Sequence, residues 1–288
     1  MYTLIGSQWR NYKIFVERLL LNLKSYSYSF MPEDKFDRVV LTFPSEAKRI
    51  YWDEILYRAH YSAIIAILRS HKWAEGVQIS YENKNYLSFC ANLRGLLESA
   101  SDSFDSLGAV PKFIAMNFNM IKSPYTKFLC PELEDALIHF SHGRRIKKGD
   151  DAPESHKAKS PTEYLRAFDP KDNSRFYDLY RELCETTHPA ARTVLMFLKP
   201  IDKKGGVITL SDSYDEILIL DFLDRYRTII DEFLEYALNL PFVLLKILNF
   251  FGDRRIETKN VEMICFDNIK LWTECKEILR EQGVYQNT

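Results

Sequence analysis

Apolar residues recur at steps of three and four positions along most of the chain, and this spacing restricts its fold more than any other feature. Residues at that spacing share one face of an α-helix, so each periodic segment predicts an amphipathic helix with a buried stripe. Only 10 glycines and 11 prolines occur among 288 residues, and 46% of the residues are hydrophobic, which is enough for a large core. We therefore predict an all-α fold, a multi-helix up-and-down bundle with at most a small β-hairpin.

Two segments depart from the helical period. The β-branched piece RVVLTF, residues 38–43, is a candidate extended segment, and Gly205–Gly206 followed by the alternating VITL predicts a turn or a small hairpin. We place domain boundaries near both segments, with an N-terminal helix and linker over 1–43, a helical core over 44–200, and a C-terminal helical extension packed on the core over 201–288. The expected helices cover residues 8–23, 44–68, 86–107, 112–121, 132–144, 162–168, 175–187, 192–198, 216–240, 241–251 and 261–282.

The bulk charge and the cysteines restrict the cellular setting. The 39 basic and 40 acidic residues give a net charge of −1, so the composition does not drive the chain as a whole toward nucleic acid or membranes. Five cysteines without CxxC spacing indicate free thiols in a reducing compartment. The N-terminus shows no secretory signal, and the longest uncharged apolar stretch, YALNLPFVLL, is half as long as a membrane span. We expect a cytoplasmic protein without membrane contact.

The stretch YRELCETTHPAA, residues 180–191, contains the strongest candidate for a chemical site. In an α-helix, seven residues turn the chain by about 700°, so Arg181 and His188 project from nearly the same line, about 10 Å apart along the axis. Tyr177 and Cys184 lie on that line too, at the edge of the apolar stripe. Pro189 disfavours the α conformation for His188 and predicts that the helix ends there. A guanidinium that can hold a phosphate beside a titratable imidazole suits the cleavage of a phosphodiester.

The same spacing also has a purely structural interpretation. Arg181 could pair with Glu185 one turn later, or locally with Glu182, while His188 only caps the helix. Any long helical protein offers several pairs of arginine and histidine, so spacing alone favours this second interpretation. The residues by themselves leave both open.

A family resemblance adds to the first interpretation. RELCETTH, residues 181–188, fits the R-x4-6-H motif of the HEPN superfamily, helical-bundle proteins that include many RNA-cleaving toxins and defence effectors. The motif lies near a helix end, as it does in that superfamily. NLRGLLESASDSF, residues 92–104, and the segment around the motif also resemble an uncharacterised bacterial helical group near the HEPN proteins. The likeness extends over residues 86–198 and implies a HEPN-like core within 44–200, with the remaining C-terminal helices added to it.

The resemblance implies a metal-independent endoribonuclease of a toxin or anti-phage defence type. His188 would assist proton transfer at the ribose 2′-hydroxyl, and Arg181 would hold the scissile phosphate. The implied partners are RNA, with tRNA as one candidate, a second copy of the chain that completes a composite site, and an antitoxin or defence-system protein. Active members commonly carry Asn, Asp or His directly after the arginine, whereas this chain has Glu182. The alternative function is a non-catalytic helical interaction module that keeps the R-x6-H pair for structural reasons.

Four residues are candidate supports of this pair: Glu182, Arg94, Glu98 and Tyr177. Arg94 and Glu98 lie one helical turn apart among leucines. An i,i+4 ion pair is the simpler interpretation of these two residues. In the other interpretation Glu98 orients Arg181 from a neighbouring helix, because a charge on an apolar helix needs a partner.

A basic run leads into the polar loop that follows the segment 132–144 and could contact a nucleic-acid backbone. Such runs are more often solvated faces, and Asp150 and Asp151 dilute this one. The candidate nucleic-acid-binding residues are Arg144, Arg145, Lys147 and Lys148.

The sequence offers no convincing metal or cofactor site. His139 and His142 share a helix end, but no third and fourth ligand follow at a recognisable spacing. Glu185 and His188 fit the ExxH element of di-iron bundles, which need two such elements, and only one is present. No Gly-rich phosphate loop, GxSxG elbow or HExxH motif occurs. We therefore predict no metal and no cofactor.

Overall fold

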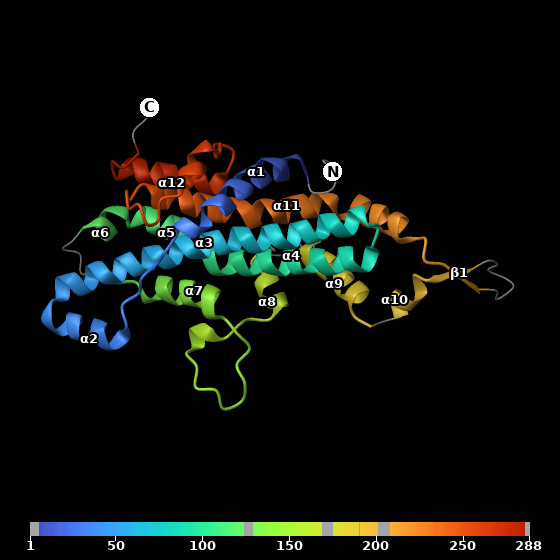
Figure 1. Ribbon diagram of the computed structural model, residues 1–288, viewed down its shortest axis with the longest axis horizontal. Helices are drawn as coiled ribbons and strands as arrows, with labels where there is room; N and C mark the ends of the chain where they lie inside the picture. The colour runs from blue at the N-terminus through green and yellow to red at the C-terminus, as the bar shows by residue number, and fades with distance from the viewer. Residues whose placement is uncertain (1–5, 124–128, 169–174, 190, 201–207, 286–288) are drawn as a thin grey trace. The chain divides into compact units, whose positions relative to one another are not determined.

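The computed structural model of the protein describes residues 6–123, 129–168, 175–189, 191–200 and 208–285. Over these residues the protein is a multi-helix, all-α structure, which confirms the predicted fold class (Figure 1). Strand β1 (Leu198–Pro200) pairs antiparallel with β2 (Ile208–Leu210), with Leu198 opposite Leu210. These two strands form the small hairpin expected there, while Gly205 and Gly206 lie outside the described residues.

Twelve α-helices and three short 3-10 helices occur in the described part of the chain. The α-helices are α1 (Gly6–Asn22), α2 (Glu33–Thr42), α3 (Pro44–Glu82), α4 (Tyr86–Leu107), α5 (Val110–Met116), α6 (Phe118–Lys122), α7 (Pro131–His142), α8 (Pro161–Leu165), α9 (Arg175–Thr187), α10 (Ala191–Leu195), α11 (Asp215–Asn249) and α12 (Lys270–Glu281). The 3-10 helices are η1 (Leu23–Ser25), η2 (Glu154–His156) and η3 (Lys259–Met263).

The candidate extended segment RVVLTF is helical up to Thr42, so the prediction of a strand was wrong there. Glu33 and Asp34 occupy the first turn of α2, where acidic side chains stabilise the helix dipole. The Thr42 hydroxyl donates to the carbonyl oxygen of Arg38 at 2.7 Å. These local contacts outweigh the β preference of the two valines, which amounts to only a few tenths of a kcal/mol.

Several other helix boundaries differ from the prediction: α3 continues to Glu82, beyond the expected end at residue 68, and the expected helix over 112–121 is divided into α5 and α6. Pro241 was expected to separate two helices, but α11 continues through it. Proline removes one helical hydrogen bond at a cost of about 3 kcal/mol, and burial of the apolar residues on both sides offsets that cost. The expected helix over 261–282 is divided into η3 and α12, because Asp267 and Asn268 favour a turn. Buried residues around Pro241 include Leu238, Leu240, Phe242, Val243 and Leu244.

The chain divides into two compact units, and each unit is made of three separate segments. Unit 1 comprises residues 1–13, 68–102 and 161–236, and unit 2 comprises residues 14–67, 103–160 and 237–288. The division into 1–43, 44–200 and 201–288 stays a prediction. In the described part of the chain, no helix is both long enough and apolar enough to cross a membrane.

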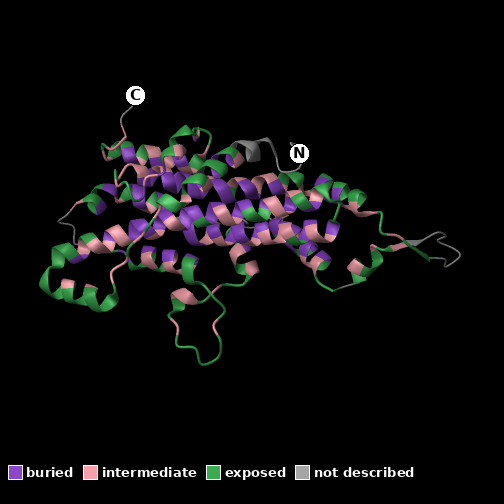
Figure 2. Ribbon diagram, in the orientation of Figure 1, coloured by how far each residue is buried: buried purple, intermediate pink, exposed green. Residues whose placement is uncertain are grey.

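Close packing of α3 against α4 in unit 1 depends on two glycines. A Cβ atom on Gly76 would lie 2.5 Å from the side-chain oxygen of Asn92, and one on Gly95 would lie 2.8 Å from the Trp73 ring. The Asn92 amide donates to the Gly76 carbonyl at 3.3 Å and to the Ser80 hydroxyl at 2.9 Å. These contacts fix the antiparallel pair on which the later helices of unit 1 pack, and Figure 2 shows the buried residues of α4 along its inner face.

Unit 2 contains a fully buried histidine. His60 on α3 lies between two hydroxyls, with the Tyr28 oxygen 2.7 Å from Nδ1 and the Thr258 oxygen 2.8 Å from Nε2. A neutral imidazole can donate from one nitrogen and accept at the other, which satisfies both partners. Burial lowers the pKa of His60 to about 3 against the attraction of Asp253, so the ring is neutral in the folded protein at ordinary pH.

We expect this histidine to make unit 2 sensitive to mild acid. The unfolded chain takes up a proton on His60 below about pH 6.5, while the folded chain does not until about pH 3, so the free energy of unfolding falls as the pH falls between these values. At pH 5 the loss is about 2 kcal/mol. Urea unfolding at pH 7.5 and pH 5.0 should show this extra loss in the wild type and not in His60→Gln. The exposed His142 is the control, and equal pH slopes for wild type and His60→Gln would contradict the prediction.

Candidate functional site

Helix α9 presents the predicted pair on its exposed side. Phe176, Leu179 and Leu183 are buried, while Tyr177, Arg181 and His188 are exposed. The helix ends at Thr187, and the backbone amide of His188 still donates to the Cys184 carbonyl at 2.9 Å. Tyr177, Arg181 and His188 therefore lie along one exposed edge of the helical segment, as their spacing predicted.

The Arg181 side chain points back along the helix and away from His188. Its guanidinium lies 3.4 Å from the Asp178 carboxylate in an i,i+3 pair, with side-chain exposures of 63% and 44%. It pairs with neither Glu185 nor Glu182, so the partners suggested by the structural interpretation were wrong. An ion pair this exposed contributes between zero and about 1 kcal/mol, which leaves Arg181 free to adopt other rotamers.

The histidine contacts a different arginine. Nη1 of Arg94, on α4, lies 3.1 Å from Nε2 of His188 and also donates to the Thr187 hydroxyl at 3.1 Å. A guanidinium can only donate hydrogen bonds, so this contact requires an unprotonated Nε2 with a lone pair on it. Arg94 therefore lies where the sequence-based hypothesis placed Arg181.

Glu98 and Tyr180 hold Arg94 in position. Nε of Arg94 donates to Oε1 of Glu98 at 2.8 Å, and the Tyr180 hydroxyl donates to the same oxygen at 3.1 Å. The Arg94 guanidinium also lies over the Tyr180 ring, 5.6 Å from its centroid. Burial would lower the pKa of Arg94, but the hydrogen bond and the charge of Glu98 raise it, so the guanidinium stays charged. The i,i+4 interpretation of Arg94 and Glu98 is confirmed, and Glu98 does not orient Arg181.

Glu182 points inward, away from the line of Arg181 and His188. Its side chain is 10% exposed, and its carboxylate accepts hydrogen bonds from Arg192, Arg225 and Tyr226. Arg225 binds both oxygens, at 2.6 and 2.8 Å. Burial would raise the pKa of Glu182, but these three partners hold it at about 2. The residue that follows the arginine is thus the buried centre of an ion cluster that joins α9, α10 and α11.

The basic run belongs to unit 2 and has a structural role at its first residue. Arg144 forms an ion pair with Asp150, and its backbone exchanges hydrogen bonds with His156 and Ala158. These contacts tie the polar loop to the end of α7. Arg145, Lys147 and Lys148 are exposed along this loop, as expected of either a solvated face or a nucleic-acid contact.

The two helix-end histidines make no metal centre. His139 Nδ1 contacts the Ser155 carbonyl at 3.0 Å, and the His142 ring stacks on His156 with centroids 5.3 Å apart. Over the described residues, no group of three or more His, Cys, Asp or Glu side chains is arranged to hold a metal ion.

Several site residues were not predicted from the sequence. Tyr180 and Thr187 contact the Arg94–His188 pair, and they are neighbours of the motif in sequence. Arg192, Arg225 and Tyr226 surround Glu182. The signal for these three was the burial of an acidic residue, since Glu182 falls within the apolar stripe of α9 and a buried carboxylate requires cationic partners.

Comparison of the chain with family models, with curated proteins and with solved structures yields no match.

Proposed function

We propose that the protein is a metal-independent endoribonuclease of a HEPN-like, toxin or anti-phage defence type. The observation that supports this best is the contact between the exposed His188 and the charged guanidinium of Arg94. The pair combines a titratable imidazole with a fixed cation, and Arg181 supplies a second, movable cation from the same helix. These are the groups that acid–base cleavage of a phosphodiester needs.

In the proposed reaction the substrate phosphate accepts the hydrogen bond that Nη1 of Arg94 otherwise makes to His188, while Glu98 keeps the guanidinium in position. This frees the lone pair on Nε2 of His188, which takes the proton of the ribose 2′-hydroxyl. The 2′-oxygen attacks phosphorus, and the bond to the 5′-oxygen breaks. The 5′-oxygen takes a proton from water and His188 releases the proton it accepted to the solvent, so the products are a 2′,3′-cyclic phosphate and a 5′-hydroxyl and the site returns to its starting state. Arg94 and Arg181 stabilise the charge that develops on the phosphate oxygens.

RNA, including tRNA, is the proposed substrate, and the proposed setting is the cytoplasm. The active form is a homodimer in which two copies of the site face one RNA, and an antitoxin or defence-system protein controls it. Arg145, Lys147 and Lys148 are proposed contacts to the RNA backbone, because they are solvent-accessible cations without a described ion-pair partner.

The test is incubation of the purified protein with total RNA and with tRNA in EDTA. The wild type should cut RNA and leave cyclic phosphate ends, and His188→Ala should reduce the rate by about 100-fold or more, within the range of general acid–base effects. His142→Ala, which changes an exposed histidine outside the site, should cut like the wild type. Absence of cleavage by the wild type, or equal cleavage by His188→Ala, would refute the proposal.

A non-catalytic interaction module is the second candidate function. The observation that favours it is a set of exposed large apolar side chains on α10, β2 and the start of α11, all within unit 1. Large exposed apolar groups of this kind are typical of contact surfaces for other proteins. Uncut RNA, together with a change of oligomeric state in Leu210→Ser, would favour this function. The exposed residues are Val194, Leu195, Ile208, Leu210, Ile217 and Leu220.

A further inference from the structure

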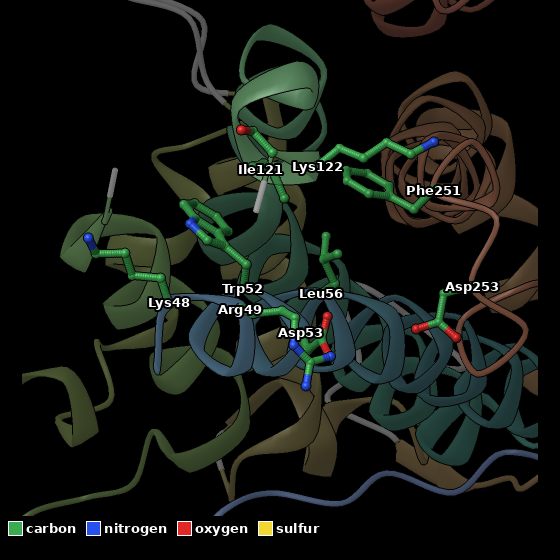
Figure 3. Close-up of a pocket in the computed structure, with 10 residues that line it drawn as sticks. Lys48, Arg49, Trp52, Asp53, Leu56, Ile121, Lys122, Phe251 and Asp253 are labelled. Atoms are coloured by element: carbon green, nitrogen blue, oxygen red, sulfur yellow. The ribbon is translucent and has the colours of Figure 1, made fainter. Parts of the chain in front are cut away.

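Unit 2 contains a pocket of about 200 Å³ that belongs to neither the Arg94–His188 pair nor the basic run. Trp52, Leu56 and Ile121 in its lining are buried, and Phe251 completes an apolar floor. Figure 3 shows the Trp52 and Phe251 rings on opposite sides of the pocket, with Leu56 and Ile121 between them. Two aromatic rings around a small apolar space can hold a flat ring between them.

Charged side chains along one side of this pocket satisfy one another. Arg49 binds Glu46 at 2.5 Å and Asp53 at 3.5 Å. Arg255 binds Asp53 at 3.7 Å and Asp253 at 2.7 Å. The five residues form a ladder of alternating charge, so its two guanidiniums are already occupied by carboxylates.

Two lysines of the lining lie outside this ladder. Figure 3 shows Lys48 extending on the Trp52 side of the pocket and Lys122 on the Phe251 side. Within the described residues neither ammonium has a carboxylate partner, and Lys122 contacts the Phe118 ring, 5.5 Å from its centroid. The ladder has three carboxylates and two guanidiniums, so its net charge is −1. The two lysines add two positive charges, which gives the group a net charge of +1. A single negative charge on a ligand would neutralise the pocket.

We infer that this pocket binds a small aromatic anion, one ring with a carboxylate or a phosphate head group. The ring lies on the apolar floor between Trp52 and Phe251, and the head group binds Lys48 or Lys122 at the rim. The volume of the pocket limits the ligand to a single ring, because a cavity of about 150 Å³ accommodates benzene and this pocket is only slightly larger. A dinucleotide or a longer nucleic acid does not fit inside it, so this site is separate from the proposed nuclease site.

Calorimetric titration of the full chain with four probes tests the inference. Benzoate and phenyl phosphate carry both ring and charge, benzyl alcohol carries the ring alone, and acetate carries the charge alone. At least one of the first two should saturate the protein with a Kd of about 1 mM or tighter. Benzyl alcohol and acetate should bind at least about tenfold more weakly, because the first lacks the negative charge and the second lacks the ring. The stronger of the two aromatic anions identifies the head group.

Variants locate the binding in this pocket. Lys48→Gln combined with Lys122→Gln should weaken the stronger probe by at least about tenfold, while Lys35→Gln, an exposed lysine on α2, should leave its Kd unchanged. No saturation by either aromatic anion at about 10 mM would overturn the inference. Equal affinity for benzyl alcohol, or for the double lysine variant, would overturn it too.

Discussion

Replacing Arg94 by glutamine should lower the rate of RNA cleavage by about 100-fold, the effect of removing one preorganised charge donor from a site. Arg181→Gln should lower it by less than about tenfold. Arg94 is 24% exposed and is held by Glu98, Thr187 and the Tyr180 ring, so its charge is already in place beside His188. Arg181 is 63% exposed and must lose side-chain freedom before it can contact a phosphate.

Single-turnover cleavage of a labelled RNA in EDTA measures both rates. Arg38→Gln is a matched control, because Arg38 also forms an exposed pair one helical turn away, with Asp34 at 3.8 Å. Arg94→Lys separates charge from geometry, since lysine keeps the charge but cannot contact His188 and Glu98 in the same fork. If Arg181→Gln lowers the cleavage rate more than Arg94→Gln does, then Arg181 and not Arg94 is the main phosphate-binding residue.

The helices of this protein could largely be predicted from the sequence, because long periodic segments determine their own structure. The predicted ranges 86–107 and 175–187 coincide with α4 and α9. The prediction was wrong where tertiary packing overrides a local signal. Pro241 is a strong helix breaker in an isolated segment, yet burial of its neighbours carries α11 through it.

The candidate site was only half predictable for the same reason. Helical spacing correctly placed Arg181 and His188 on one exposed edge, since both belong to one helical segment. It could not place Arg94 against His188, because these residues are 94 positions apart in the chain and their contact depends on how α4 and α9 pack. The inward direction of Glu182 follows from its place in the apolar stripe, but its partners on α10 and α11 do not.

Substitution of Glu182 by glutamine should lower the free energy of unfolding by about 2–3 kcal/mol at pH 7. The carboxylate accepts four hydrogen bonds from Arg192, Arg225 and Tyr226, and it holds two guanidiniums that would otherwise repel each other. A neutral amide cannot accept all of these bonds and offers them no charge. Both arginines are 41% exposed, so water partly compensates the loss and keeps it below that of a fully buried pair.

The pH dependence of stability provides a second readout of the same cluster. Folding lowers the pKa of Glu182 from its ordinary value of 4.5 to about 2, so this carboxylate stabilises the folded protein above about pH 4.5. That stability is lost as the pH falls from about 4.5 to about 2, because the unfolded chain binds the proton first. In Glu182→Gln the free energy of unfolding should therefore fall less than in the wild type as the pH falls from about 4.5 to about 2.

Glu185→Gln is the control, because it removes a carboxylate that binds the same arginine but is exposed, whereas Glu182 is buried. Glu185 lies on the same helix and binds the same Arg192 at 3.3 Å, but its side chain is 54% exposed. An exposed pair contributes less than about 1 kcal/mol, so this variant should unfold at nearly the wild-type urea concentration. If Glu182→Gln shifts the midpoint no more than Glu185→Gln does, the cluster does not hold α9, α10 and α11 together. A clear difference would instead mean that Glu182 is retained for stability, leaving the exposed edge of α9 to Arg181 and His188.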